Sequence, residues 1–297
     1  MNYRSKLLLP LVTTSAIVTM SSNAALIFHS SMDNIDVGAG AGTDTTSAGT
    51  YSVGNSVGAN GVAGGNANTT PVATTGGHVT SGTSGQIGQA VSFPGNGNAG
   101  VRYDGIANAG TGGYSVSLWF NFNGNAQNGM LAAMGNTGSS GEGWSVFYEN
   151  GSLIYRMSVG GGGSDLRAAV NTTIANDSNW HHAALVIDPT GGVINGYLDG
   201  VAATGIGSGG PPDGTFVSDG DGVANGDPLF LGVRGSGGFQ FRGDLDDVAI
   251  WDESLDSTAV SGIYQNGLSG IGVGIPEPSS LVMVCLGMSG LLRRRRK

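Results

Sequence analysis

Apolar and polar residues alternate with a period of two along most of the chain after residue 86. The clearest example is "YSVSLWFNF", residues 114 to 122, in which the apolar face consists of Val116, Leu118, Phe120 and Phe122. Such alternation predicts a β-strand with one face toward a core. The same pattern predicts further strands near 88–93, 144–149, 152–159, 180–188, 193–203, 228–233 and 239–251.

Turn residues separate these runs at short intervals. Asn150-Gly151 is a strong two-residue hairpin signal, and Asp199-Gly200 marks another turn. The chain has 56 glycines, and glycine disfavours helices. We therefore predict an all-β fold, an antiparallel β-sandwich of the jelly-roll type.

One short helix is predicted after the last strand. Asp256 or Ser257 can cap it, and Val260, Ile263 and Tyr264 share one face. We expect this helix to pack against the edge of the sandwich.

The segment 37–85 has a different composition from the rest. It is rich in Gly, Ala, Thr, Asn and Ser, and Tyr51 is its single aromatic residue. A segment with so few large apolar side chains buries little surface, so we predict a long excursion or short strands.

The N-terminus has the features of a signal peptide. Basic Arg4 and Lys6 precede an apolar run that ends near Met20, and cleavage is expected between Ala24 and Ala25. Residues 1–24 would then direct the chain to the Sec translocon and signal peptidase.

The C-terminus combines an extended motif, a short apolar run and a basic end. Pro276-Glu277-Pro278 precedes residues 279–292, a predicted transmembrane helix about 21 Å long against roughly 30 Å of hydrocarbon. Four arginines follow, Arg293, Arg294, Arg295 and Arg296. We place a linker at 271–275 and this terminal unit at 276–297. A permanent single-pass anchor is the simpler alternative.

This terminal unit resembles the PEP-CTERM sorting signal of Gram-negative bacteria. The resemblance implies a transient anchor in the inner membrane and recognition by an exosortase-type membrane transpeptidase. It also implies delivery to the cell surface or to an extracellular polysaccharide matrix such as a biofilm.

Charge excludes one class of partner. Between residues 25 and 275 five basic residues stand against 20 acidic ones, which gives a net charge of −15. Such a surface repels phosphate backbones, so nucleic-acid binding is not expected. Cys285 is the single cysteine, so no disulfide can form within the chain.

The strand region resembles the laminin-G-like, concanavalin A-like jelly roll. The matching stretches are "LIFHSSMDN" (26–34), "GQAVSFPGNG" (88–97), "WHHAALVID" followed by "GYLDGV", and "GDLDDVAIWDESLDSTAVSGIYQNG" (243–267). The resemblance implies one domain over residues 25–270, and the excursion 37–85 departs from the compact family pattern.

Catalysis is not expected. A glycosidase on such a fold needs two carboxylates that flank the scissile bond, but Glu142, Glu149 and Glu253 are not spaced to gather on one strand. Adjacent His181 and His182 point to opposite faces of a strand and cannot chelate one metal.

Calcium is the cofactor that the acidic residues suggest. Alternation places Asp246 on the face of Val248 and Ile250, where a carboxylate needs a partner. Because the first and last strands of the resembling fold are close together, Asp33 and Asp246 form a candidate Ca²⁺ pair. Hydrogen bonds to loop amides or to Arg242 are the alternative. A second candidate is the loop 218–227, with Asp219, Asp221 and Asp227.

Carbohydrate binding would use an exposed aromatic ring. Among the four tryptophans, Trp144 lies beside two glycines and is the one least expected to pack in the core. We therefore expect an exported, non-catalytic surface or matrix protein whose jelly roll binds glycan or serves in adhesion. The alternatives are a polysaccharide-active hydrolase, or a structural protein that self-assembles through segment 37–85.

Overall fold

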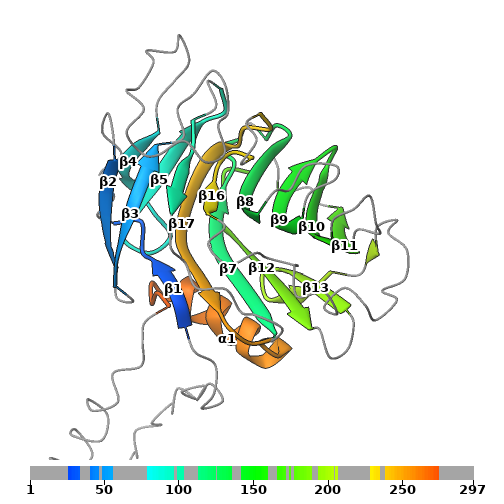
Figure 1. Cartoon of the computed structure of the whole chain (residues 1–297). Coiled ribbons are helices and arrows are strands. Elements are labelled where there is room, and N and C mark those ends of the chain that lie inside the picture. The colour runs from blue at the N-terminus through cyan, green and yellow to red at the C-terminus, as the bar shows by residue number, and fades with distance from the viewer. Residues whose placement is uncertain are drawn as a thin grey trace, which may run out of the picture.

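In the part of the chain that the computed structural model describes, the architecture is a β-sandwich with one helix (Figure 1). The described residues are 26–33, 41–46, 49–55, 79–96, 99–103, 113–124, 126–135, 142–159, 166–171, 174, 177–188, 193–203, 205–206, 228–234 and 238–273. The signal segment 1–24, the apolar tail and the loop 218–227 lie outside them.

Sheet A has eight strands in the order β14-β13-β12-β7-β17-β5-β4, with β1 beside β17. Their bounds are β1 Leu26–Ser30, β4 Thr80–Ser84, β5 Gln89–Pro94, β7 Tyr114–Asn121, β12 His181–Asp188, β13 Val193–Leu198, β14 Val201–Ala202 and β17 Arg242–Trp251.

Sheet B has nine strands in the order β15-β11-β10-β9-β8-β16-β6-β3-β2. Their bounds are β2 Ala41–Thr46, β3 Gly49–Asn55, β6 Val101–Tyr103, β8 Gly129–Gly135, β9 Glu142–Glu149, β10 Ser152–Val159, β11 Leu166–Asn171, β15 Gly205–Ile206 and β16 Leu229–Leu231. The strand pairings within both sheets are antiparallel, which confirms the predicted fold class.

The main core lies between the two sheets. β7 contributes Val116, Leu118 and Phe120, and Phe122 follows it. Trp144, Leu153 and Tyr155 come from β9 and β10 of sheet B. We call the sides of the sheets that meet at this core the inner faces, and the opposite sides the outer faces.

The predicted turns are confirmed at two places. Asn150 and Gly151 have φ values of 50° and 84°, and Asp199 and Gly200 have 52° and 73°. Both residues of each pair therefore adopt the left-handed backbone that a two-residue hairpin requires.

Helix α1, Ser257–Leu268, follows β17 and is capped by Asp256, whose carboxylate accepts a hydrogen bond from the Ala259 amide at 2.8 Å. The expectation that it packs on an edge is wrong. Val260 and Ile263 form a second buried cluster with residues of β12, β13 and β17, so α1 covers the outer face of sheet A near the lower ends of β7 and β17 (Figure 1).

The Gly/Ala/Thr-rich excursion contributes strands to both sheets. β2 and β3 extend sheet B from β6, and β4 ends sheet A. The prediction of short strands is therefore confirmed for 41–46, 49–55 and 80–84, while residues 56–78 lie outside the described part.

Candidate functional site

A β-bulge in β17 sets the position of the two adjacent aspartates. The register against β7 shifts between Asp246 and Ala249, and Asp247 has a φ of 46°. A bulge adds one residue to a strand and interrupts the alternation of its side chains. Asp246 pairs with Trp119, on the outer face.

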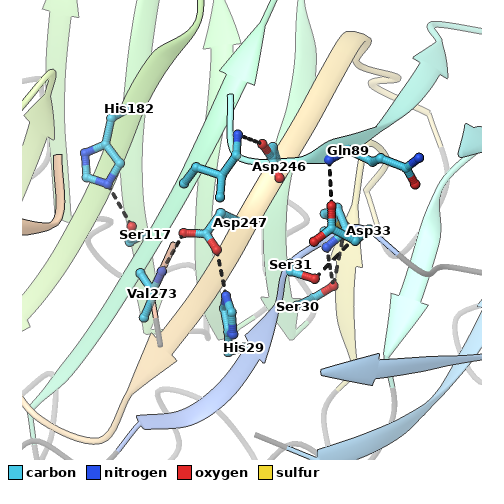
Figure 2. A network of polar contacts seen from close by, with 12 residues as sticks. His29, Ser30, Ser31, Asp33, Gln89, Ser117, His182, Asp246, Asp247 and Val273 are labelled. Carbon is cyan, nitrogen blue, oxygen red and sulfur yellow. Dashed lines mark hydrogen bonds and ion pairs between the residues drawn. The ribbon is translucent and has the colours of Figure 1, made fainter. Parts of the chain in front are cut away.

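The predicted facing of Asp246 is therefore wrong. Alternation placed Asp246 toward the core with Val248 and Ile250. The bulge turns both carboxylates to the side of sheet A that α1 and the segment after it cover (Figure 2).

Asp247 links β1 and the residues after α1 to β17. One of its oxygens lies 2.7 Å from His29 Nε2 of β1, and the other accepts a hydrogen bond from the Val273 amide at 3.0 Å (Figure 2). Val273 is buried with the α1 cluster. Residues 271–273, expected to be part of a linker, thus form a strap that is attached to the domain.

Asp33 and Asp246 meet at the turn 85–89 between β4 and β5. Asp246 accepts a hydrogen bond from the Ile87 amide at 2.8 Å, and Asp33 accepts one from the Gln89 amide at 2.6 Å (Figure 2). The alternative of hydrogen bonds to loop amides therefore describes both residues. Across the described ranges, no three His, Cys, Asp or Glu side chains gather closely enough to hold a metal ion.

Asp246 is the most perturbed acid of this site. It is fully buried, and one of its oxygens lacks a hydrogen-bond partner within the described structure. Burial raises the pKa of Asp246 to about 8, and the neighbouring charges of Asp247 and Asp33 add to the rise against the Ile87 hydrogen bond. The carboxyl group is thus largely protonated at neutral pH.

The sequence interpretation missed a buried serine–histidine contact on the same face. Ser117 Oγ lies 2.7 Å from His182 Nε2, and burial lowers the pKa of His182 to about 4. The Trp119 ring lies 5.3 Å from His182 and stacks on Tyr264 of α1 at 5.6 Å. The helix encloses this contact, so a substrate cannot reach the serine without displacing α1.

His181 lies on the other face, as predicted, between two aspartates. Its Nδ1 is 2.8 Å from Asp199 and its Nε2 is 3.0 Å from Asp177. Burial acts to lower the pKa of His181, but these two carboxylates outweigh burial and raise it.

Trp144 does not have the expected exposure. Its indole is completely buried in the main core, 6.0 Å from the Tyr114 ring. Alternation along β9 directs it inward, so the neighbouring glycines do not leave it free to stack on a sugar. Trp119 and Trp251 are also buried, and Trp180 is partly exposed.

The glutamates considered for catalysis are separated. Glu142 and Glu149 begin and end β9, about 24 Å apart at a strand rise of about 3.4 Å per residue, and Glu253 follows β17. Other predicted site residues lie outside the described ranges. They are Asp219, Asp221, Asp227, Ala24, Ala25 and the sorting residues Pro276, Glu277, Pro278 and Arg293 to Arg296.

The two stacked antiparallel sheets with a single covering helix define a lectin-like jelly roll. The chain belongs to the concanavalin A-like lectin/glucanase superfamily, whose family model matches residues 95–261. A second family model, the PEP-CTERM protein-sorting motif, matches residues 274–297. This motif indicates export and surface sorting in Gram-negative bacteria and implies processing by an exosortase.

Solved structures support the same fold at low sequence identity. Domain 4 of AbnA, a GH43 extracellular arabinanase from Geobacillus stearothermophilus solved with arabinotriose, has a TM-score of 0.53 and 21% identity over 80% of this chain and 97% of that one. The receptor binding domain of a botulinum neurotoxin C/D mosaic serotype has a TM-score of 0.52 and 12% identity. This match covers 81% of this chain and 51% of the toxin domain.

A comparison with curated protein sequences finds no significant match. In the described ranges no helix has the length and apolar character needed to cross a membrane.

Proposed function

We propose that this protein is an exported, non-catalytic surface or matrix protein whose jelly roll binds carbohydrate. The observation that carries the proposal is the presence, on one chain, of a lectin-family jelly roll and a surface-sorting motif. Export places the domain where extracellular glycans are its available ligands, and the AbnA domain was solved with an arabinose oligosaccharide.

The arrangement of acids supports a role without catalysis. Glycoside hydrolysis needs two carboxyl groups within roughly 5 to 10 Å of each other, on either side of a bound sugar. Asp246 and Asp247 are the closest such pair in β17, but they are buried and hydrogen-bonded to His29, Ile87 and Val273. They hold segments of the chain together.

The test combines binding with turnover. The full chain, purified in mild detergent, is applied to an array of neutral and acidic polysaccharides with and without EDTA, and the same polysaccharides are assayed for released sugars. We expect binding without release. Hydrolysis that disappears in Glu142→Gln or Glu149→Gln would show that the protein is an enzyme.

We also propose that Asp33 and Asp246 are the residues that would bind Ca²⁺. Displacement of the Ile87 and Gln89 amides would free two carboxylates for the cation. If EDTA weakens binding, Asp33→Asn and Asp246→Asn should abolish the EDTA effect. An EDTA effect that survives both substitutions would place the calcium elsewhere.

A further inference from the structure

Four large apolar side chains are exposed in the described part of the chain, and two of them lie close together in sequence. Leu268 ends α1 with 50% of its surface exposed, and Ile271 follows in the strap with 58%. The other two, Val193 and Val201, lie in β13 and β14. Exposed apolar side chains that gather at one place mark interaction sites more often than single ones do.

The turn 85–89 between β4 and β5 extends this surface. The Gln86 side chain donates a hydrogen bond to the Gly267 carbonyl at 3.0 Å, so the turn lies against the end of α1. A Cβ placed on Gly272 would be 3.4 Å from Ile87 Cγ2, so the strap passes along the same turn, where Ile87 is partly exposed. We call three residues the apolar patch: Ile87, Leu268 and Ile271.

The segment that carries most of the patch is uncharged, although the domain is acidic. Residues 257–275 contain no charged side chain, whereas residues 25–275 have a net charge of −15. Asp256, which caps α1, is at the opposite end of the helix, about 18 Å from Leu268 at 1.5 Å per residue. This end of α1 can therefore contact lipid without removing a carboxylate from water.

The acids beside the patch already have partners. Asp246 and Asp247 are buried, and they accept hydrogen bonds from backbone amides of the turn 85–89 and of the strap. Asp33 is partly exposed and accepts the Gln89 amide at the edge of the turn. Asp33 therefore sets the limit of the uncharged area.

The predicted membrane helix follows the patch closely in the chain. The amide of Val273 in the strap is held by Asp247 at 3.0 Å (Figure 2), and the PEP-CTERM motif begins at the next residue. Residues 274–278 span at most about 18 Å when fully extended, and the predicted membrane helix 279–292 comes directly after them. A chain anchored by this helix therefore keeps the patch near the bilayer.

We propose that the apolar patch rests on the lipid surface of the membrane while the chain is anchored by its C-terminal tail. This inference goes beyond carbohydrate binding and rests on the predicted anchor. Because α1 and the strap are fixed to sheet A, contact of Leu268 and Ile271 with lipid gives the whole domain one orientation on the bilayer. Phospholipids without net charge suit this surface, since the domain is acidic. A patch of this size is too small to hold the domain by itself, so removal of the tail releases the domain.

The experiment reports how close single positions lie to lipid. In the full chain with Cys285→Ala, one cysteine at a time is introduced by Leu268→Cys, Ser84→Cys or Asn128→Cys and is labelled with a polarity-sensitive fluorophore. The chains are reconstituted in vesicles of phosphatidylethanolamine and phosphatidylcholine that contain a lipid with a nitroxide just below the headgroup, which quenches the fluorophore at short range. Circular dichroism and thermal unfolding check that each variant is folded.

The three positions separate contact with lipid from tethering. Ser84 is exposed at the end of β4 beside the turn 85–89, so it is near the patch in space but far from the tail in sequence. Asn128 is exposed next to the β9–β10 turn of sheet B and is the control. We expect quenching at positions 268 and 84 to be at least about threefold stronger than at position 128.

A charge in the patch should remove this difference. In the Ser84→Cys chain, Leu268→Asp/Ile271→Asp should lower the quenching at position 84 to the level of position 128, because lipid contact would take the new carboxylates out of water. Val193→Asp is the matched control. It replaces another exposed valine, in β13, four strands from β5 in sheet A, and should leave the quenching at position 84 unchanged.

Three results would overturn the inference. Equal quenching at positions 84 and 128 would show that the anchored domain has no fixed face toward lipid. A blue-shifted emission at position 268 without quenching by lipid would indicate a second copy of this chain on the patch. Failure of the chains to float with the vesicles would overturn the predicted anchor as well. Glycan takes no part in these measurements, so the proposed carbohydrate-binding function is tested separately.

Discussion

The outer faces of the two sheets differ in what covers them and in which polar side chains they carry. On sheet A, α1 and the strap 271–273 cover β7, β12 and β17, and Asp247 and Ser117 there bind His29, the Val273 amide and His182. On sheet B, half-buried arginines occupy one register row on strands that carry few acids. Buried polar groups whose partners are internal hold a structure together.

The largest expected effect is the difference in free energy of unfolding that is lost when one side chain on each outer face is replaced by alanine. Trp119→Ala removes a buried ring that stacks on Tyr264 and should reduce the free energy of unfolding by about 3 to 5 kcal/mol. Arg156→Ala, half-buried on sheet B, should cost about 1 kcal/mol or less. Urea unfolding measures both, and Trp119→Phe should lose less than Trp119→Ala. Equal costs for Trp119→Ala and Arg156→Ala would remove the contrast between the faces.

The second prediction tests the attachment of the chain ends to sheet A. Asp247→Ala leaves His29 and the Val273 amide without their partner and should cost about 2 to 3 kcal/mol. Hydrogen exchange should show faster exchange at Val273, while the amides of β9 and β10 keep their protection. Asp247→Asn, which retains one acceptor, should have a smaller effect. Unchanged exchange at Val273 in the Ala variant would contradict the role of Asp247.

The third prediction concerns the pH dependence that Asp246 confers on the same face. Its pKa is about 8 in the folded state against 3.8 for the free side chain, so the folded state retains a proton that the unfolded state releases between these values. Stability should therefore decrease as pH rises from about 4 to 8. Asp246→Asn should remove this cost, so its gain in stability over the parent should grow as pH rises from about 4 to 8. A variant that is less stable than the parent at pH 8 would favour a cation ligand instead.

The smallest expected effect is a difference between the two adjacent histidines in the pH at which each titrates. The pKa of His181 is raised by its two aspartates, so its stabilisation is complete below pH 6.5 and is lost as pH rises through the raised value. The pKa of His182 is lowered to about 4, so its stabilisation is lost as pH falls from 6.5 toward 4. Proton NMR should show His181 titrating above pH 6.5 and His182 near 4. Two midpoints near 6.5 would indicate that α1 does not enclose His182.

Much of the fold could be predicted because its signals are local. The turns at Asn150-Gly151 and Asp199-Gly200 require positive φ values that few residue types adopt, and Asp256 caps α1 through the nearby Ala259 amide. The apolar face of β7 also follows from alternation, since each side chain's face is set by its position in the strand.

The candidate sites could not be predicted so well because they depend on distant pairings. The bulge at Asp247 breaks the alternation that the sequence suggests, so the expected orientation of Asp246 is reversed. Trp144 was expected to be free because of its glycine neighbours, but its strand directs it into the core.

The sequence by itself determined the strand and turn chemistry and the sorting motif, because each depends on residues close together in the chain. Tertiary structure decided which residues meet. Arg102, Arg156 and Arg167 lie on strands that are not all consecutive, and only the strand order and register of sheet B place them in one row. The covering of sheet A by α1 and the strap is likewise set by packing of buried apolar surface, which is not encoded in any local pattern.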